Sequence, residues 1–363
     1  MAATTPPVWP DAQTLWMSND RVLEMAQAVL GAADAPVGLT PKALIWRKNK
    51  ARLYRYLRSE PATHQTPIFL VLPLINRSYI LDLRPGASFV EFLLGQGYDV
   101  FLIDWGTPAD EDQALDITTL VTRYLPRAAK AIQRASGADQ MTVLGYCIGG
   151  TLAACFAALH PEVTRNLVLL TAPLDFSDAG QFGRMTARGI FPVQQLTDTF
   201  PTVPAQLPDI GTKLLNPMAS YVGTYRQLYE KLGVETFDVR GWQAMYRWVN
   251  DSVPFAGSAF RQWIVEFYQE NRLARDELEM EGRPVRLSEI HCPVLNIAAS
   301  RDQIAPRPTT SFVVGHVSSD DASEILVEGG HVGIVVGRSA SQNLWPKVGA
   351  WLDSHDGPTA AGP

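Results

Sequence analysis

The sequence predicts an α/β fold in which a mostly parallel sheet carries an inserted, mainly helical cap. Short apolar or β-branched segments alternate with helical patterns along most of the 363 residues, as in sheets built from strand–helix–strand units. Between about residues 176 and 287 the alternation stops, and prolines and aromatic side chains replace the strand signals. The expected strands are 52–56, 68–74, 100–104, 142–144, 167–171, 294–299 and 324–327.

This break divides the chain into an N-terminal appendage, a core in two parts, an inserted cap subdomain and a disordered tail. The predicted boundaries, in chain order, are 1–35, 36–175, 176–287, 288–355 and 356–363. The appendage should form a short amphipathic helix at 20–31, and the cap should contain helices at 239–250 and 259–271. The apolar face of the first helix would consist of Val22, Met25, Ala26, Val29 and Leu30.

The composition is that of a globular protein, with 46% hydrophobic and 19% charged residues. A formal net charge of −6 argues against bulk nucleic-acid binding. The sequence begins without a secretory-signal pattern and has no apolar run approaching ~18 residues, so we expect a soluble, cytoplasmic protein without a transmembrane segment. The cysteines are widely spaced and predict neither disulfides nor a metal site, and Cys155 and Cys292 are expected in the core.

The most informative motif is Gly145-Tyr-Cys-Ile-Gly149, which follows a short apolar strand and precedes a helical pattern. Its two glycines lack the Cβ atoms that would collide in a sharp strand-to-helix turn, so Cys147 can be exposed on a strained turn. A thiolate there lies at the start of a helix, where backbone amides favour negative charge. The motif resembles the nucleophile elbow of α/β-hydrolases, with cysteine where serine usually stands. The alternative is a buried structural cysteine.

A nucleophile in this fold needs an acid and then a histidine, each after a later strand. Asp302 follows the strand expected at 294–299, and His331 follows the strand at 324–327 in the sequence Glu-Gly-Gly-His. The order Cys147, Asp302, His331 is therefore the predicted catalytic triad. The alternatives left open are Asp104 and Asp175 for the acid and His291 and His316 for the base.

The same fold supplies backbone amides that stabilise a tetrahedral oxyanion. One comes from the residue after the nucleophile, Ile148, and the other from the loop at 73–76, where Ile75 is the candidate. Among the aromatic residues of the cap, Trp248 and Phe255 are candidates for a substrate channel, although aromatic residues at helical spacing are more often simply core.

From about Val37 to Trp351 the chain resembles the catalytic subunit of polyhydroxyalkanoate (PHA) synthases of the short two-subunit types, class III and class IV. Three segments, 37–42, 46–50 and 298–302, favour class IV. The resemblance implies catalytic roles for Cys147, Asp302 and His331, which occupy the positions of the family's Cys, Asp and His. The segments that carry it are 72–85, 101–108, 145–151, 248–257 and 260–268.

The resemblance implies an acyltransferase that polymerises (R)-3-hydroxyacyl-CoA, in particular 3-hydroxybutyryl-CoA, and releases coenzyme A. A cysteine suits this chemistry, because exchange of one thioester for another keeps the acyl group activated. No cofactor is expected beyond the coenzyme A of the substrate, and the sequence leaves open whether Asp302 orients His331 or activates the 3-hydroxyl. The implied partners are the growing polyester, a small accessory subunit and a second copy of the chain, at the surface of cytoplasmic polyester granules.

Two other functions remain open on the same residues. The first is a hydrolase, either an acyl-CoA thioesterase or an intracellular polyester depolymerase, since a triad alone does not decide whether water or a hydroxyl reaches the acyl-enzyme. The second is a non-catalytic scaffold protein of the granule. The intact residues Gly145, Cys147, Gly149, Asp302 and His331 argue against it.

Overall fold

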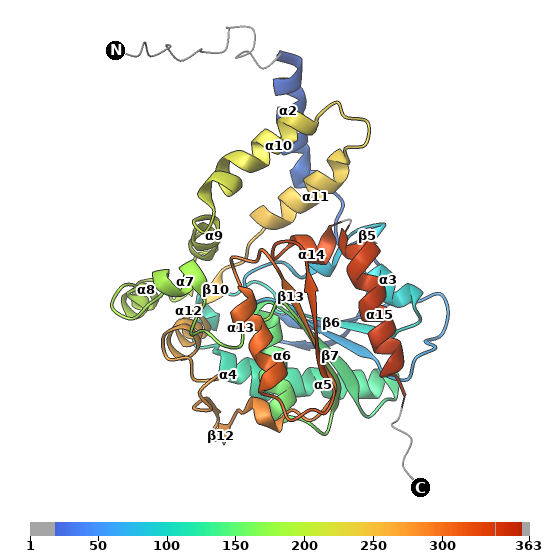
Figure 1. The fold of residues 1–363 in the computed structure, drawn as a ribbon, viewed down its shortest axis with the longest axis vertical. Helices are drawn as coiled ribbons and strands as arrows, with labels where there is room; N and C mark the ends of the chain where they lie inside the picture. Colours follow the sequence, from blue (N-terminus) through green and yellow to red (C-terminus); the bar gives the residue numbers. More distant parts are fainter. Residues whose placement is uncertain (1–18, 338, 358–363) are drawn as a thin grey trace, which may run out of the picture.

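A mostly parallel sheet forms the centre of the computed structural model, which describes residues 19–337 and 339–357 (Figure 1). The sheet has eight strands in the order β1-β2-β6-β3-β7-β8-β13-β14. All neighbours from β6 to β14 are parallel, whereas β2 is antiparallel to β6 and β1 is antiparallel to β2. In this order, the strands are Lys42–Lys48, Ala51–Tyr56, Val100–Asp104, Ile68–Val71, Met141–Tyr146, Thr164–Leu170, Val294–Ala299 and Ala322–Val327.

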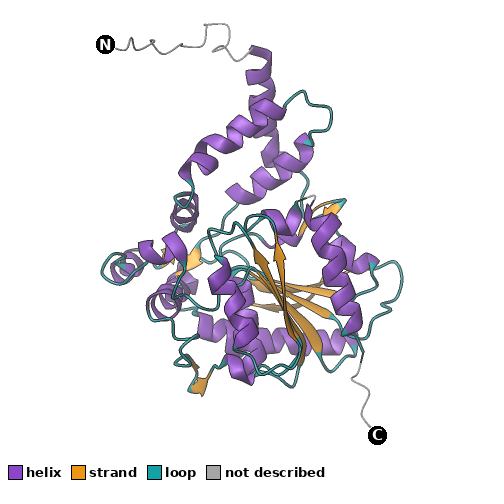
Figure 2. Ribbon diagram, viewed as in Figure 1, coloured by secondary structure: helices purple, strands orange, loops and turns teal. Residues whose placement is uncertain are grey.

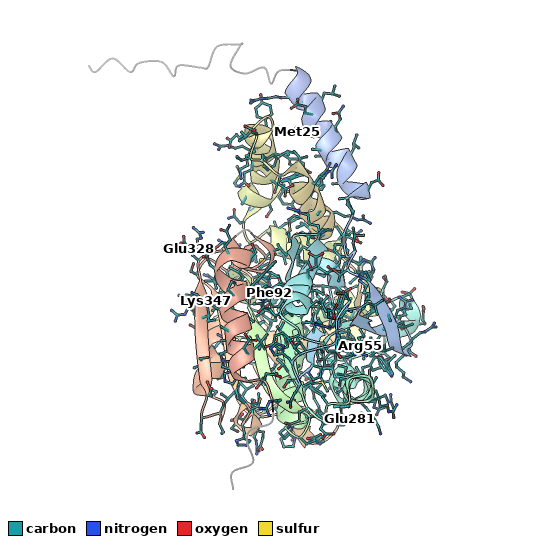
Figure 3. All side chains as sticks on the ribbon, turned by 90° about the vertical axis from the view of Figure 1, so that its right-hand side faces the viewer. Met25, Arg55, Phe92, Glu281, Glu328 and Lys347 are labelled. Carbon is teal, nitrogen blue, oxygen red and sulfur yellow. The ribbon has the colours of Figure 1, made fainter. Side chains whose placement is uncertain are left out.

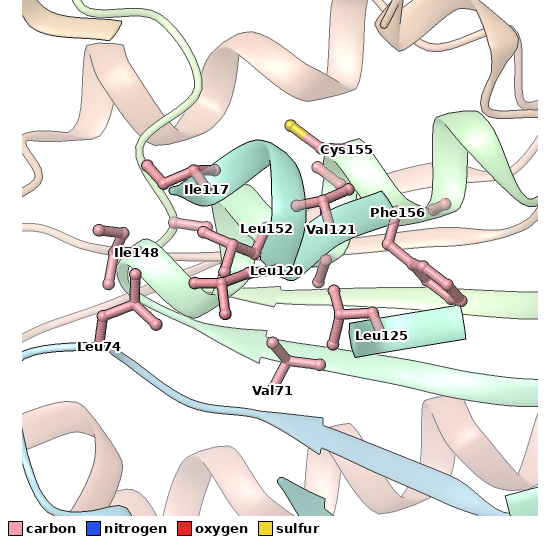
Figure 4. Close-up of a cluster of buried hydrophobic side chains, with 14 of the residues drawn as sticks. Val71, Leu74, Ile117, Leu120, Val121, Leu125, Ile148, Leu152, Cys155 and Phe156 are labelled. Atoms are coloured by element: carbon pink, nitrogen blue, oxygen red, sulfur yellow. The ribbon is translucent and has the colours of Figure 1, made fainter. Parts of the chain in front are cut away.

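Helices cover both faces of this sheet (Figure 2). Because side chains alternate along a strand, Phe69 and Val71 of β3 join one buried cluster while Ile68 and Leu70 join the other. The first cluster includes α5 (Leu125–Ser136) and α6 (Ile148–Leu159), and Figure 4 shows Leu125, Leu152 and Phe156 of these helices in the same cluster as Val71. The second includes α3 (Phe89–Gly95) and α15 (Trp345–Ser354). Remaining core helices are η2 (Ser78–Leu81), η3 (Asp110–Asp112), α4 (Ile117–Thr119), η4 (Leu120–Tyr124), η7 (Leu287–Glu289), α13 (Arg307–Ser311), η8 (Phe312–Gly315), α14 (Gly333–Val336) and η9 (Ala340–Leu344).

The predicted α/β fold is confirmed, and each expected strand is present within a few residues of its predicted ends. The sequence analysis missed β1, an edge strand whose residues are half-buried or exposed. A shift of register between Leu44 and Trp46 interrupts the two-residue alternation that marks a half-buried strand. Beside the main sheet lie the short antiparallel pairs β4 (Asp82–Arg84) with β5 (Ala87–Ser88), β9 (Thr202–Val203) with β10 (Phe255–Ala256), and β11 (Glu279–Met280) with β12 (Arg283–Pro284).

Between β8 and β13 the chain is mainly helical. The expected helix at 239–250 is α11 (Val239–Asn250), and the one at 259–271 is α12 (Gly257–Gln262) continued by the π-helical η6 (Trp263–Gln269). Single π-helical turns inside helices are frequent at functional sites. The other helices of this region are α7 (Gly180–Met185), α8 (Val193–Thr199), α9 (Gln206–Lys213), η5 (Met218–Gly223) and α10 (Thr224–Lys231).

The N-terminal helix α2 (Asn19–Gly31) packs against the helices α10 and α11 rather than on the sheet (Figures 1 and 3). Its buried side is centred on Ala28, with Met25 and Val29 beside it, and is followed by a short 3₁₀ turn, η1 (Ala32–Asp34). The predicted apolar face is therefore rotated: Leu30 is 75% exposed and Val22 is 38% exposed. The helix turns the small side chain of Ala28 towards its neighbours, which allows close packing.

The ordered chain extends past the predicted start of the tail. The Asp356 carboxylate accepts hydrogen bonds from the backbone amides of Gln65 (3.1 Å) and Thr66 (2.9 Å) and so ties the chain after α15 to the loop before β3. Residues 1–18 and 358–363, which belong to the predicted appendage and tail, lie outside the described residues. Among the described helices, none is long and apolar enough to span a membrane.

Candidate active site

Cys147 occupies a strained turn between β7 and α6. Its backbone has φ 54° and ψ −132°, a conformation that non-glycine residues rarely adopt and that costs of order 1–3 kcal/mol. A Cβ at Gly145 would collide with the backbone of Gly150, and one at Gly149 would collide with the backbone of Val71 and Leu72. The two predicted elbow glycines therefore allow β7, α6 and β3 to approach closely.

The strand register explains why Asp302 and His331 meet. Strands β13 and β14 are parallel, and their last residues, Ala299 and Val327, are paired, so the two following loops start side by side. A backbone hydrogen bond from Arg301 N to Gly329 O (2.9 Å) joins these loops. His331 Nδ1 then lies 2.6 Å from Asp302 Oδ2.

Both oxygens of the Asp302 carboxylate are hydrogen-bonded within the protein. Its second oxygen, Oδ1, accepts hydrogen bonds from the amides of Ile304 (2.8 Å) and Ala305 (2.9 Å), and its side chain is 0% exposed. A carboxylate held in this way fixes the orientation of the imidazole and the nitrogen that carries its proton.

The alternative acids and bases lie elsewhere. Asp104 accepts hydrogen bonds from Gly106 N and Ser78 Oγ, and Asp175 accepts them from Ser177 and Asn271. His316 is exposed and stacked on Phe312, with its Nδ1 2.7 Å from the carbonyl oxygen of that residue. Cys147 lines the same cavity as His331 and shares a hydrogen bond with its side chain, so the structure brings together the three residues of the predicted triad.

The environment of His331 favours its protonated form. Burial alone would lower the pKa of the imidazole, but the charges of Cys147 and Asp302 and the hydrogen bonds to both side chains outweigh burial and raise the pKa to about 10. Burial raises the pKa values of the thiols of Cys155 and Cys292 to about 12 and keeps both neutral.

Two cavities of different character meet at Cys147. The first, about 260 Å³, is lined in part by polar side chains, and the second, about 200 Å³, is mostly apolar. They share Ile75, Cys147, Pro208, Thr212 and Ile304. Polar side chains of the first, called here the polar cavity, are Asn76, Asp209, Lys213, Ser220, Ser252 and His331. Aromatic side chains of the second, called the apolar cavity, are Phe182, Phe191, Phe255, Phe260, Trp263 and Tyr268.

The remaining predicted residues lie around these cavities. Ile75 lines both of them, and Ile148 lines the apolar cavity and begins α6, whose first amides have no acceptor within the helix. Of the two channel candidates, Trp248 lines the polar cavity and Phe255 lines the apolar cavity.

Sequence reasoning missed two features of the site. Tyr146 packs its ring against His331, with ring centroids 5.3 Å apart, although its place inside the elbow motif was a signal. Lys213 and Asp209 form a 2.7 Å ion pair in the wall of the polar cavity. Their spacing of four residues was visible, but nothing in it shows that the pair faces the nucleophile.

The fold and the site define a protein of the α/β-hydrolase fold with cysteine at the nucleophile elbow. A family model for this fold matches residues 82–337, and the monoacylglycerol lipase of Paleococcus ferrophilus has the same fold. That structure aligns with a TM-score of 0.53 at 16% identity and covers 84% of this chain and 99% of the lipase. An esterase from Thermogutta terrifontis aligns with a TM-score of 0.51 at 10% identity, covering 87% of this chain and 100% of the esterase.

The chain belongs to the poly(3-hydroxyalkanoate) polymerase PhaC family. The PhaC subunit of Haloferax mediterranei is 36% identical over 95% of this chain and 69% of the relative, and that of Allochromatium vinosum is 33% identical over 90% and 92%. A family model described as the N-terminus of poly-beta-hydroxybutyrate polymerase (PhaC) matches residues 19–93. The similarity therefore begins upstream of Val37 and includes helix α2.

The raised pKa of His331 predicts that a charged imidazole lies beside Cys147 at neutral pH. His331 should keep its proton from its ordinary pKa near 6.5 up to about 10. Alkylation by iodoacetamide at pH 7 should be roughly tenfold slower in His331→Gln, because the variant removes this positive charge from beside the sulfur. Mass spectrometry of modified Cys147 measures this, with Cys147→Ala as the blank, and equal rates would contradict a role for the His331 charge.

Proposed function

We propose that the chain polymerises (R)-3-hydroxyacyl-CoA, with 3-hydroxybutyryl-CoA as the main substrate, and releases coenzyme A by covalent catalysis on Cys147. The observation that carries this proposal is the meeting of two unlike cavities at a cysteine beside a histidine–carboxylate pair. Membership of the PhaC family supports the reaction class, since relatives are named poly(3-hydroxyalkanoate) polymerase subunits. The reaction then has two steps, acylation of the cysteine and transfer to a hydroxyl.

In the first step the Cys147 thiolate attacks the thioester carbonyl of the substrate. A new carbon–sulfur bond forms, and the tetrahedral intermediate carries its negative charge on oxygen, where the amides of Ile148 and Ile75 would donate hydrogen bonds. Collapse breaks the bond to coenzyme A, whose thiolate takes the proton from the His331 imidazolium. The products are acyl-Cys147, neutral His331 and free coenzyme A.

In the second step the 3-hydroxyl of the next unit or of the chain attacks acyl-Cys147. Neutral His331 accepts the hydroxyl proton, an ester bond forms, and the Cys147 thiolate leaves. The thiolate and imidazolium are thereby restored. Both steps pass one proton through the same nitrogen of His331, which lines the polar cavity.

The geometry supports an orienting role for Asp302. A base acting directly on a substrate hydroxyl must come within about 3 Å of it. The Asp302 side chain is 0% exposed, and its two oxygens are already engaged with His331 and with two backbone amides. We therefore assign Asp302 to holding His331 rather than to activating the 3-hydroxyl.

The two cavities suggest where the parts of the substrate bind. The amide-rich pantetheine arm of coenzyme A needs hydrogen-bond partners, which the polar cavity offers in Asn76, Ser252 and the Lys213–Asp209 pair. A polyester chain with methyl side groups suits the apolar cavity and its aromatic wall. That wall also limits the access of water, which favours transfer to a hydroxyl over hydrolysis.

Incubation with 3-hydroxybutyryl-CoA tests the proposed reaction. The chain should release free thiol and form ether-insoluble polyester, while Cys147→Ala should do neither and keep the circular dichroism spectrum of the parent protein. Release of thiol with free 3-hydroxybutyric acid would show a thioesterase instead. If neither polyester nor free acid formed, the result would favour the non-catalytic scaffold.

Asp302→Asn distinguishes the two roles of the carboxylate. In the variant, the amide oxygen can still accept from Ile304 and Ala305, which leaves the amide N–H facing His331 Nδ1 and forces the proton to the other ring nitrogen. Acylation and elongation should therefore both fall by about 10³–10⁴-fold. Single-turnover thiol release and polymer yield measure the two steps, and Asp175→Asn should stay within about twofold of wild type. If acylation stayed intact while elongation was lost, Asp302 would instead be assigned to activating the 3-hydroxyl.

We also propose that the cap mediates assembly, with a second copy of the chain, an accessory subunit and the surface of a cytoplasmic polyester granule as its partners. Contiguous exposed apolar residues often mark such contacts. The stretch from α9 through η5 to the start of α10 has exposed apolar residues at Leu207, Ile210, Leu214, Met218, Tyr221, Val222 and Tyr225. On α2, Val22, Leu23 and Leu30 are also exposed.

The accessory subunit is tested by comparing the isolated chain with the chain co-expressed with the protein encoded beside it. The isolated chain should show a lag and a lower specific activity with 3-hydroxybutyryl-CoA. A second pair of preparations should lack residues 1–35. Loss of stimulation in the truncated pair alone would place the docking site on the appendage, and full activity of the isolated chain without a lag would contradict the two-subunit assignment.

A further inference from the structure

The structure places two of the segments that carry the family resemblance against each other. One is 72–85, which begins with the loop that carries Ile75, and the other is 248–257, where α11 ends and the chain turns towards α12. Asn76 and Ser252 form an isolated antiparallel bridge between them. The loop of the core is therefore paired with a segment of the cap.

Backbone groups on both sides of Asn76 are held by this cap segment. The Val253 amide donates to the carbonyl oxygen of Ile75 at 3.0 Å. The indole Nε1 of Trp248 donates to the carbonyl oxygen of Arg77 at 2.9 Å. Trp248 is only 4% exposed, so its N–H has little access to water as an alternative partner.

Asp251 adds a side-chain link at the same place. One carboxylate oxygen lies 3.0 Å from Arg77 Nε, and the other accepts a hydrogen bond from the Tyr79 hydroxyl, also at 3.0 Å. Burial, together with the charge of Asp251, raises the pKa of the Tyr79 hydroxyl, which therefore remains a neutral donor. One carboxylate thus joins two residues of the core segment to the end of α11.

The core itself holds the other end of this loop. Trp105 Nε1 donates to the carbonyl oxygen of Leu72 at 2.8 Å, directly after β3. From Ile75 to Arg77, by contrast, the backbone hydrogen bonds described above all come from the cap. Ile75, which would supply the second oxyanion amide, therefore follows a residue held by the core and begins the part of the loop that is held by the cap.

We propose that Trp248, Asp251 and Val253 form a clamp that positions the oxyanion loop, so that Ile75 is in place only while this part of the cap is docked. Trp248 and Asp251 are positioning residues that act through the loop backbone. The proposal rests on the covalent chemistry of Cys147 proposed above. It links cap position to catalysis, because movement of 248–253 would displace an oxyanion donor while leaving Cys147, His331 and Asp302 in the core.

Two reagents separate this role from a general effect on the site. Acylation by p-nitrophenyl acetate passes through a tetrahedral oxyanion, whereas alkylation by iodoacetamide is a direct displacement at sulfur and needs no oxyanion donor. In Asp251→Ala the p-nitrophenolate burst should be at least tenfold slower, below the 10²–10³-fold loss typical of removing a donor outright. Alkylation of Cys147 should stay within about twofold of wild type. Asp251→Asn, which keeps an acceptor, should be intermediate.

Asp238 provides a matched control at the opposite end of α11. It also pairs with an arginine of the core, Arg84, and its other hydrogen bond is to Gly241 N of its own helix rather than to 75–77. Asp238→Asn weakens that ion pair and keeps an amide oxygen that can cap Gly241 N, so both reactions should run at wild-type rates. Trp248→Phe, which keeps an aromatic ring and removes the N–H, should reproduce the selective loss of acylation even if Asp251→Ala fails to fold.

Equal loss of acylation and alkylation in Asp251→Ala and Trp248→Phe would overturn the clamp, because it would show a general disturbance of Cys147. Unchanged acylation in both variants would also overturn it. The p-nitrophenyl ester reports on the oxyanion donors whatever the natural substrate is. Failure of the parent chain to polymerise 3-hydroxybutyryl-CoA would therefore reject the proposed function without deciding the clamp.

Discussion

The close approach of β7 to α6 is the constraint on which the site depends. No Cβ fits at Gly145 or Gly149, so the chain passes from strand to helix at a single residue and Cys147 takes a positive φ. This strain persists because the surroundings cannot relax: every residue of β7 and of α6 is buried. The sulfur is thereby fixed at the carboxyl end of a central strand.

The parallel sheet brings the other groups to the same edge. Loops after β3, β7, β13 and β14 carry Ile75, Cys147, Asp302 and His331, and parallel pairing makes all four strands end on one side. The His331–Asp302 hydrogen bond follows from the alignment of the two last strands. The positive charge of His331 then follows from its two neighbours, Cys147 and Asp302, which favour its proton in spite of its burial.

The cap supplies much of the surface around Cys147. Pro208 and Thr212 of α9 line both cavities. The cap therefore lies between the polar cavity and the apolar cavity, which meet at Cys147. The loop at 75–77 takes its backbone support from the same cap through 248–253. A triad of this kind is shared by hydrolases and transferases. The choice between water and a hydroxyl therefore depends on side chains that come from a different part of the chain.

The sequence by itself determined the α/β fold, the elbow at Cys147 and the order of the acid and the histidine, because these features are written in short segments whose glycines and strand patterns act locally. It did not reveal the edge strand β1, the buried side of α2, the Lys213–Asp209 pair in the cavity wall beside Cys147, or the contact of 248–253 with the loop that carries Ile75. Only the tertiary structure decided these features. Some of them join residues that are far apart in the chain, and the others depend on which side of a helix packs against a neighbour. The spacing of residues within a segment does not identify its distant partner. Packing and hydrogen bonding select that partner when the chain folds.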